Sequence, residues 1–177
     1  MARYFTLTES ERLLPDVERS LKDALFHKSE YQKADDELDG SVQHIRMSGG
    51  ARVDRGAYLA TRARRDSSAG ALKDALEQIA QIGAFVKDLD IGLIDFLSLY
   101  HGREVCLCWK LGEDRIQFWH GTDEGFRGRK EIDDEFRSSH KGDQGSDSAG
   151  TWAPSQARAS ARNASSRGEK VRSMAIT

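Results

Sequence analysis

The chain has few cysteines and few prolines. Its 177 residues include only two of each. The two cysteines, Cys106 and Cys108, are separated by a single residue. A disulfide between them would close a small, strained ring and could not stabilise a fold by linking distant segments. They also supply only half of the ligands that a four-thiolate zinc site needs. A disulfide scaffold is therefore excluded, a metal–thiolate site is disfavoured, and we expect reduced thiols.

Long apolar runs and a dominant charge sign are missing as well. No stretch approaches the ~20 apolar residues that cross a bilayer, and the first residues lack the apolar centre of a signal peptide. The 27 basic and 29 acidic residues give a net charge of -2, so no global imbalance points to nucleic acid or an anionic membrane. Phosphate-binding loop, Rossmann and metalloprotease motifs are missing too. We expect a soluble, cytoplasmic protein, and the common enzyme classes are not favoured.

Two long helical segments are predicted before residue 84. In "TLTESE", Thr8 and Glu11 have the spacing of a capping box, which satisfies the first free backbone N–H groups of a helix. Pro15 is best tolerated in a first helical turn, so we place the start of the long helix near it, with a bend after Leu13. The apolar stripe of this first helix has the spacing of a coiled coil and comprises Val17, Leu21, Ala24, Tyr31, Leu38, Val42 and Ile45.

A second helical run follows the paired glycines of "MSGGARVD" and ends at Gly83. Its apolar side comprises Leu59, Ala63, Ala69, Leu72, Leu76, Ile79 and Ile82. Two long helices joined by a short loop most economically form an antiparallel hairpin, which we place at about residues 8–83.

The period changes to two after Gly83. The segment from about 84 to 132 alternates apolar and polar residues around glycine turns, which predicts three or four short antiparallel strands. From Ser138 onward the periodicity is lost, and serine, alanine, glycine and arginine dominate. We therefore predict an α+β fold with a single domain over residues 1–137, and a disordered tail over 138–177.

The stretch "REVCLCWKLGEDRIQFWH" holds both cysteines and is predicted to form a β-hairpin. Its register can be chosen by burial: pairing Trp109 with Ile116, Leu107 with Phe118 and Val105 with His120 makes one face almost wholly apolar. In the alternative register, shifted by one residue, Cys106 meets His120. Burial favours the first register, which puts the thiols and the imidazole on opposite faces of the hairpin.

Four segments together resemble an uncharacterised prokaryotic family known as domain of unknown function 2203. They are "YFTLTESERLLPDVE", "KDLDIGLIDF", "HGREVCLCWKLGEDRIQFWH" and "GFRGR", and they cover most of the chain from Tyr4 to Ile132. The resemblance implies a helical hairpin followed by a small β-unit. It implies no known activity.

A first candidate site is the polar set around the predicted strands. Carboxylates and an imidazole suit a hard or borderline divalent ion. The members that we expect to converge are Asp88, Asp90, Glu104 and His120. Asp95 belongs to the same set, but it points to the opposite side of the sheet unless Gly92 marks a bulge. The alternative is that these acids cap turns and pair with nearby arginines.

A second candidate is a basic patch at the presumed tip of the hairpin. Between residues 46 and 65 a single acid, Asp54, accompanies six arginines, namely Arg46, Arg52, Arg55, Arg62, Arg64 and Arg65. Such a patch could contact nucleic-acid phosphates, although a solvated helix end explains the same residues. In "GFRGR", Arg127 and Arg129 could bind a small anion, or the loop could simply dock Phe126.

Three functions remain open on this basis. The one we favour is a non-enzymatic scaffold or interaction module that self-associates as a homodimer, because two helices leave part of a long apolar stripe uncovered. The second is a divalent metal or small-ligand site on the β-unit. The third is contact with nucleic acid through the arginine-rich tip. No membrane partner and no other cofactor are expected.

Overall fold

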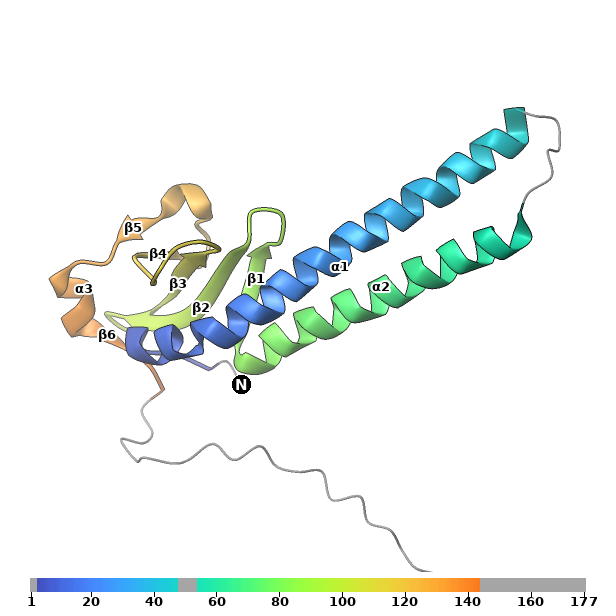
Figure 1. Ribbon diagram of the computed structural model, residues 1–177. Helices are drawn as coiled ribbons and strands as arrows, with labels where there is room; N and C mark the ends of the chain where they lie inside the picture. Colours follow the sequence, from blue (N-terminus) through green and yellow to red (C-terminus); the bar gives the residue numbers. More distant parts are fainter. Residues whose placement is uncertain (1–2, 48–53, 144–177) are drawn as a thin grey trace, which may run out of the picture. The chain divides into compact units, whose positions relative to one another are not determined.

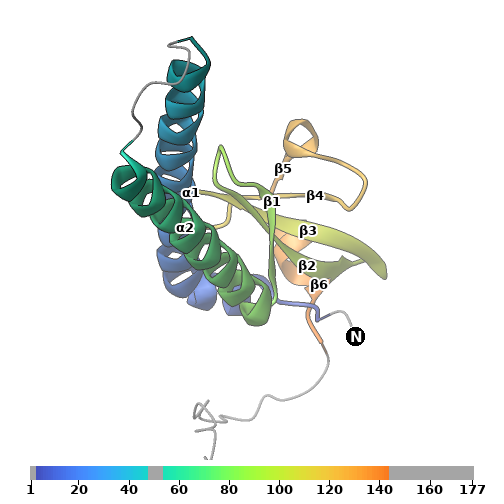
Figure 2. The same ribbon diagram turned by 90° about the vertical axis from the view of Figure 1, so that its right-hand side faces the viewer.

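The computed structural model describes residues 3–47 and 54–143 of the chain. Two long helices, α1 (Leu7–Met47) and α2 (Arg55–Ile82), run antiparallel and precede an antiparallel sheet. Figures 1 and 2 show the sheet lying against one end of the helix pair, whose other end extends away from it. The predicted α+β architecture is confirmed. The glycine loop between the helices lies outside the described residues. No helix in the described ranges carries an apolar stretch sufficient to span a bilayer.

Helix α1 begins earlier than the sequence suggested. Its capping box is formed by Thr6 and Glu9, not by Thr8 and Glu11: the Glu9 carboxylate accepts the Thr6 backbone N–H at 2.7 Å, and Thr6 Oγ1 accepts the Glu9 N–H at 3.2 Å. Pro15 lies inside α1, which is one unbroken helix from Leu7 to Met47. The start predicted near Pro15 was wrong. Pro15 lies on the exposed side of α1, where water can bond the backbone carbonyl that the missing N–H leaves free, while its neighbour Leu14 is buried in the core.

Helix α2 has a well-defined cap at each end. The Asp54 side chain accepts the N–H groups of Gly56 and Ala57, and Gly83 closes the helix in the left-handed region with φ 99°. The apolar side predicted for α2 is only partly buried: Ile79 is fully buried, whereas Leu59 is 49% exposed. Away from the sheet the buried residues of the helix pair are Ala34 and Leu38 of α1 and Ser68 of α2, so only a few side chains are enclosed between the helices there.

The sheet contains more strands than the sequence predicted. Its order is β1-β2-β3-β4-β5, with β6 paired to β2. The strands are β1 (Ala84–Asp88), β2 (Leu93–Tyr100), β3 (Arg103–Lys110), β4 (Phe118–Gly121), β5 (Lys130–Glu131) and β6 (His140–Lys141). A short 3-10 helix, η1 (Phe126–Gly128), joins β4 to β5, and α3 (Asp134–Ser139) joins β5 to β6.

The boundary predicted at Ser138 falls inside α3. Phe136 of this helix is fully buried, and its ring stacks on Trp119 with centroids 4.9 Å apart. His140 follows directly and accepts the Leu7 backbone N–H, which ties the segment to the start of α1. Ordered structure therefore continues to residue 143, because one aromatic residue in a short polar segment is enough to dock it. The rest of the predicted tail lies outside the described residues.

The sheet has two faces, which we call the helix face and the thiol face. The helix face carries Ile94, Phe96, Val105, Leu107 and Trp109, which pack with α1 and Phe136 into the hydrophobic core. The thiol face carries Asp95, Cys106, Cys108, Phe118 and His120, the alternate residues of the same strands.

Gly92, in the turn from β1 to β2, has φ +65°, and a Cβ there would lie 2.7 Å from Leu111 Cβ. We expect Gly92→Ala to lower the free energy of unfolding by about 2–4 kcal/mol, from backbone strain plus a steric clash. Gly102, with φ +74° and open space around it, is the matched control, and Gly102→Ala should cost about 1 kcal/mol. Urea unfolding measures both. Equal losses would contradict the close approach of Leu111.

Candidate functional site

The hairpin register predicted by burial was wrong. Strand β4 pairs with β3 so that Cys106 faces His120, Leu107 faces Trp119 and Cys108 faces Phe118. Strand β2 places Asp95 directly opposite Cys108. The imidazole and both thiols therefore share the thiol face, as in the register that we rejected.

Three side chains with metal-binding atoms converge at this place. Asp95, Cys106 and His120 each offer one ligand atom, and these atoms lie within 4.8 Å of one another. All three residues are buried, with His120 fully inaccessible to solvent. They come from three adjacent strands, so their spacing is fixed by backbone pairing and not by a loop. We call this group the Asp–Cys–His cluster.

His120 is held on both sides of its ring. Nε2 lies 3.2 Å from one Asp95 carboxylate oxygen and 3.3 Å from the other, and Nδ1 lies 2.7 Å from the Gly121 carbonyl oxygen. Because a carbonyl only accepts, Nδ1 carries a proton that it donates to Gly121. The hydrogen bond to Asp95 raises the pKa of His120, against the opposing effect of burial. His120 therefore stays protonated to a higher pH than a free imidazole, in a buried hydrogen-bonded pair with Asp95.

The thiols are kept protonated. Burial, reinforced by the nearby Asp95 carboxylate, raises the pKa of Cys106 from 9.0 to about 12. The same two causes, in the same order, raise the pKa of Cys108 further. A thiol with a raised pKa is a weak nucleophile, so neither cysteine has the environment of a catalytic thiolate.

The loop from β4 to β5 lies beside this face. Arg129 of the "GFRGR" segment stacks its guanidinium on Phe118, 4.1 Å from the ring centroid, and pairs with Glu113 at 2.7 Å. It also donates to the Cys108 carbonyl at 3.3 Å. Arg129 is thus engaged in a fixed set of contacts, while Arg127 is exposed on η1. The simpler interpretation of this segment, a docked turn, fits these contacts better than an anion site.

Of the four residues predicted to bind metal, the structure brings only His120 into the cluster. Asp88 caps its own turn by accepting the N–H groups of Asp90 and Ile91. Asp90 is exposed and pairs with Lys28, and Glu104 accepts the Tyr4 hydroxyl. The acids that we expected to converge instead each have a separate partner. Asp95, which the sequence placed on the opposite side, is the one that meets His120.

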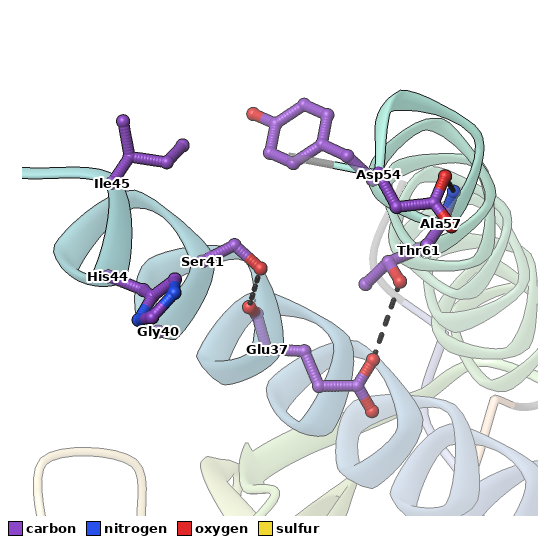
Figure 3. A pocket seen from close by; sticks show the side chains of 9 residues that line it. Glu37, Gly40, Ser41, His44, Ile45, Asp54, Ala57 and Thr61 are labelled. Atoms are coloured by element: carbon purple, nitrogen blue, oxygen red, sulfur yellow. Dashed lines mark hydrogen bonds between the residues drawn. The ribbon is translucent and has the colours of Figure 1, made fainter. Parts of the chain in front are cut away.

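The far part of the helix pair is a second region of interest. We call residues 31–47 of α1 and 55–70 of α2 the arm, because Figure 1 shows it projecting beyond the sheet. Near its end the helices leave a hollow of about 490 Å³, lined by residues of both. Figure 3 shows Glu37 at its floor, with Thr61 donating to the Glu37 carboxylate and Ser41 to the Glu37 carbonyl. The hollow is open to solvent, and both polar and apolar side chains line it.

The arginines of the predicted basic patch are partly neutralised. Arg64 pairs with Glu37, Arg65 with Asp35 and Asp66, and Arg62 more distantly with Asp66. Arg46 and Arg55 are exposed at the two helix ends, and Arg52 lies outside the described residues. Two of these acidic partners, Glu37 and Asp35, lie 27 and 30 positions before the arginines that they pair with, so the local sequence did not show the pairing.

Residues 3–132 match a protein family described as "Uncharacterized conserved protein (DUF2203)". No curated protein and no solved structure matches the chain.

Proposed function

From the premise that this chain belongs to the DUF2203 family of uncharacterized conserved proteins, we propose that it is a cytoplasmic interaction module whose arm binds the arm of a second copy. The observation that carries the proposal is the separation of charge between the two helices of the arm. The β-unit anchors one end of the helix pair, and the arm presents these charges away from it (Figure 1).

The α1 side of the arm is acidic. Between residues 31 and 47 it has four carboxylates against two basic side chains, and the acids fall within five consecutive residues, namely Asp35, Asp36, Glu37 and Asp39. The α2 side is basic. Between residues 55 and 70 one acid, Asp66, accompanies Arg55, Arg62, Arg64 and Arg65.

Part of this charge has no ion-pair partner in the part of the chain that the structure describes. Among the described residues, Asp36, Asp39 and Arg55 are exposed and form no ion pair. The ion pair between Arg64 and Glu37 shows that the acidic and basic groups lie at the same level along the arm. A twofold axis can therefore place the acidic side of each copy on the basic side of the other, in two equivalent contacts. Leu59, 49% exposed on the basic helix, adds apolar area.

Sedimentation velocity at low and high salt tests this proposal. We expect a dimer at low salt that weakens at high salt, because exposed charges more than about 10 Å apart are screened at 0.1 M ionic strength. Arg55→Glu combined with Arg62→Glu should raise the dimer Kd at least ~10-fold, or about 1.4 kcal/mol. Adding Asp36→Lys and Asp39→Lys to that variant should restore the dimer, because the charges are then exchanged between the two sides.

Lys73→Glu is the matched control, since Lys73 is an exposed base of α2 outside the arm. It should leave the dimer Kd unchanged. A protein that stays monomeric at low salt and high concentration would refute the proposal, as would a loss of dimer in Lys73→Glu equal to that in the double variant. Far-ultraviolet circular dichroism confirms that each variant keeps its helices.

Nucleic-acid contact is less well supported by the same residues. Three of the arginines that would contact phosphates are already engaged with carboxylates. Those carboxylates also lie beside the arginines and would repel a phosphate backbone. We therefore do not put nucleic-acid binding forward as a second function.

A further inference from the structure

The geometry points to a transition-metal site: we propose that Asp95, Cys106 and His120 bind one zinc-class divalent ion on the thiol face of the sheet. The site lies outside the arm and is independent of the proposed self-association. It uses one carboxylate oxygen, one thiolate sulfur and one imidazole nitrogen, all buried and within 4.8 Å of one another.

The spacing of the three atoms is close to what a tetrahedral ion requires. With bonds of about 2.0–2.3 Å from zinc to nitrogen, oxygen and sulfur, neighbouring ligand atoms lie roughly 3.3–3.8 Å apart. His120 Nε2 and the nearer Asp95 oxygen are 3.2 Å apart, almost at that spacing. From the 4.8 Å limit, Cys106 Sγ needs to approach by at most about 1.0–1.5 Å, which rotation of a small side chain can supply.

The ligand set favours one class of ion. Calcium and magnesium bind oxygen ligands and avoid sulfur, so a thiol in a three-ligand set disfavours them. Imidazole, thiolate and carboxylate together are ligands of zinc and of its spectroscopic substitute cobalt(II). Three protein ligands leave a fourth position for water, the arrangement found at catalytic rather than structural zinc sites.

The hydrogen bonding of His120 prepares it to bind a metal. Its Nδ1–H donates to the Gly121 carbonyl at 2.7 Å, which fixes the ring so that Nε2 faces Asp95. Histidines that bind metals almost always donate their other ring N–H to a carbonyl or carboxylate in this way. In neutral His120 the Nε2 lone pair therefore points toward Asp95.

Charge balance allows the ion to enter a buried place. In the bound site the 2+ ion would face one carboxylate, one thiolate and one neutral imidazole, so the ion and its ligands together carry no net charge. Binding releases the Cys106 thiol proton to solvent. A site of zero net charge avoids the main cost of burying an ion.

Titration of the full-length, reduced and chelator-treated protein with cobalt(II) and then zinc tests the site. We expect one equivalent of cobalt to bind, with a thiolate-to-cobalt charge-transfer band, and zinc to displace it. Cys106→Ser should abolish that band. Asp95→Asn and His120→Ala should each weaken zinc binding at least ~100-fold, since even partners of the ligands contribute 10–100-fold.

Cys108→Ser is the matched control, because Cys108 is buried on the same face two residues away but is not in the cluster. It should keep the band. A second control, Asp90→Asn, changes an exposed acid that we had expected to bind metal. The proposal is overturned if no charge-transfer band forms, or if the band survives Cys106→Ser and disappears in Cys108→Ser. Because Cys106→Ser changes only one atom, circular dichroism of that variant separates loss of metal from loss of fold.

Discussion

Replacing Asp95 with alanine should lower the free energy of unfolding by about 3–5 kcal/mol near pH 6, because removing one partner of a buried ion pair leaves the other charge uncompensated. Asp95 is 3% exposed and His120 is fully buried, so water cannot replace the lost carboxylate. Asp95→Asn keeps the shape and one hydrogen-bond acceptor and should cost less. Urea unfolding in the presence of a chelator measures both, free of any contribution from bound metal.

The loss of folding stability in Asp95→Ala should become smaller as the pH rises. The pKa of His120 is raised in the folded protein, chiefly by its hydrogen bond to Asp95. The stability that this pair contributes is therefore fully present below the unfolded-state pKa of about 6.5 and is lost as the pH rises through the higher folded-state pKa. The difference in stability between the wild type and Asp95→Ala should shrink over that window.

Asp90→Asn is the control for this effect, because Asp90 is also an aspartate in an ion pair but its side chain is 79% exposed. An exposed pair contributes about 0–1 kcal/mol, so this variant should lose little. If Asp95→Ala were no less stable than Asp90→Asn, the buried pair would not exist as described.

The second large effect concerns the two thiols. We expect Cys106 and Cys108 to react with a thiol reagent at pH 8 at least ~1000-fold more slowly in the folded protein than in urea. Burial raises the pKa of Cys106 from 9.0 to about 12, which alone lowers the thiolate fraction by about three orders of magnitude. The pKa of Cys108 is raised for the same reason, and both side chains are enclosed.

A cysteine introduced on the surface provides the comparison. Ser29 is an exposed residue of α1, so in Ser29→Cys one thiol should react rapidly and two slowly. Mass spectrometry after peptide digestion identifies which cysteine carries the label. Labelling of Cys106 or Cys108 within tenfold of the rate at residue 29 would contradict their burial on the thiol face.

Most of the fold could be predicted because its signals are local. The helix pair follows from two long apolar stripes separated by glycines, and the end of α2 follows from Gly83, which adopts the left-handed conformation that glycine favours. The start of α1 was misplaced because "TLTESE" contains two overlapping capping boxes two residues apart. The structure uses Thr6 and Glu9, which lets Leu7 enter the core.

The predicted pairing of β3 with β4 was wrong because burial of one face was taken as the deciding effect. Phe118 and Trp119 are adjacent aromatics, so either can face the core. Trp119 does so, because Phe136 stacks on it from α3, a helix that the sequence did not predict. Phe118 instead packs under Arg129 on the thiol face. Ile116 is buried without joining β4, which makes the turn longer than predicted.

The cluster could not be predicted once the register was wrong. Asp95, Cys106 and His120 are distant in sequence, and only the pairing of β2, β3 and β4 brings them together. A shift of one residue moves His120 to the other side of the sheet. The acids predicted instead are turn and surface residues, whose partners, such as Lys28 and Tyr4, come from elements far away in the chain.

The contact between Cys106 and His120 decides whether the thiol face exists as described, and nuclear Overhauser effects can detect it directly in the metal-free protein. The pairing predicts cross-peaks from the Cys106 Hβ protons to the His120 ring, and between the backbones of Leu107 and Trp119. Cross-peaks from Val105 side-chain protons to the His120 ring, with Leu107 opposite Phe118, would show the other register and remove the cluster.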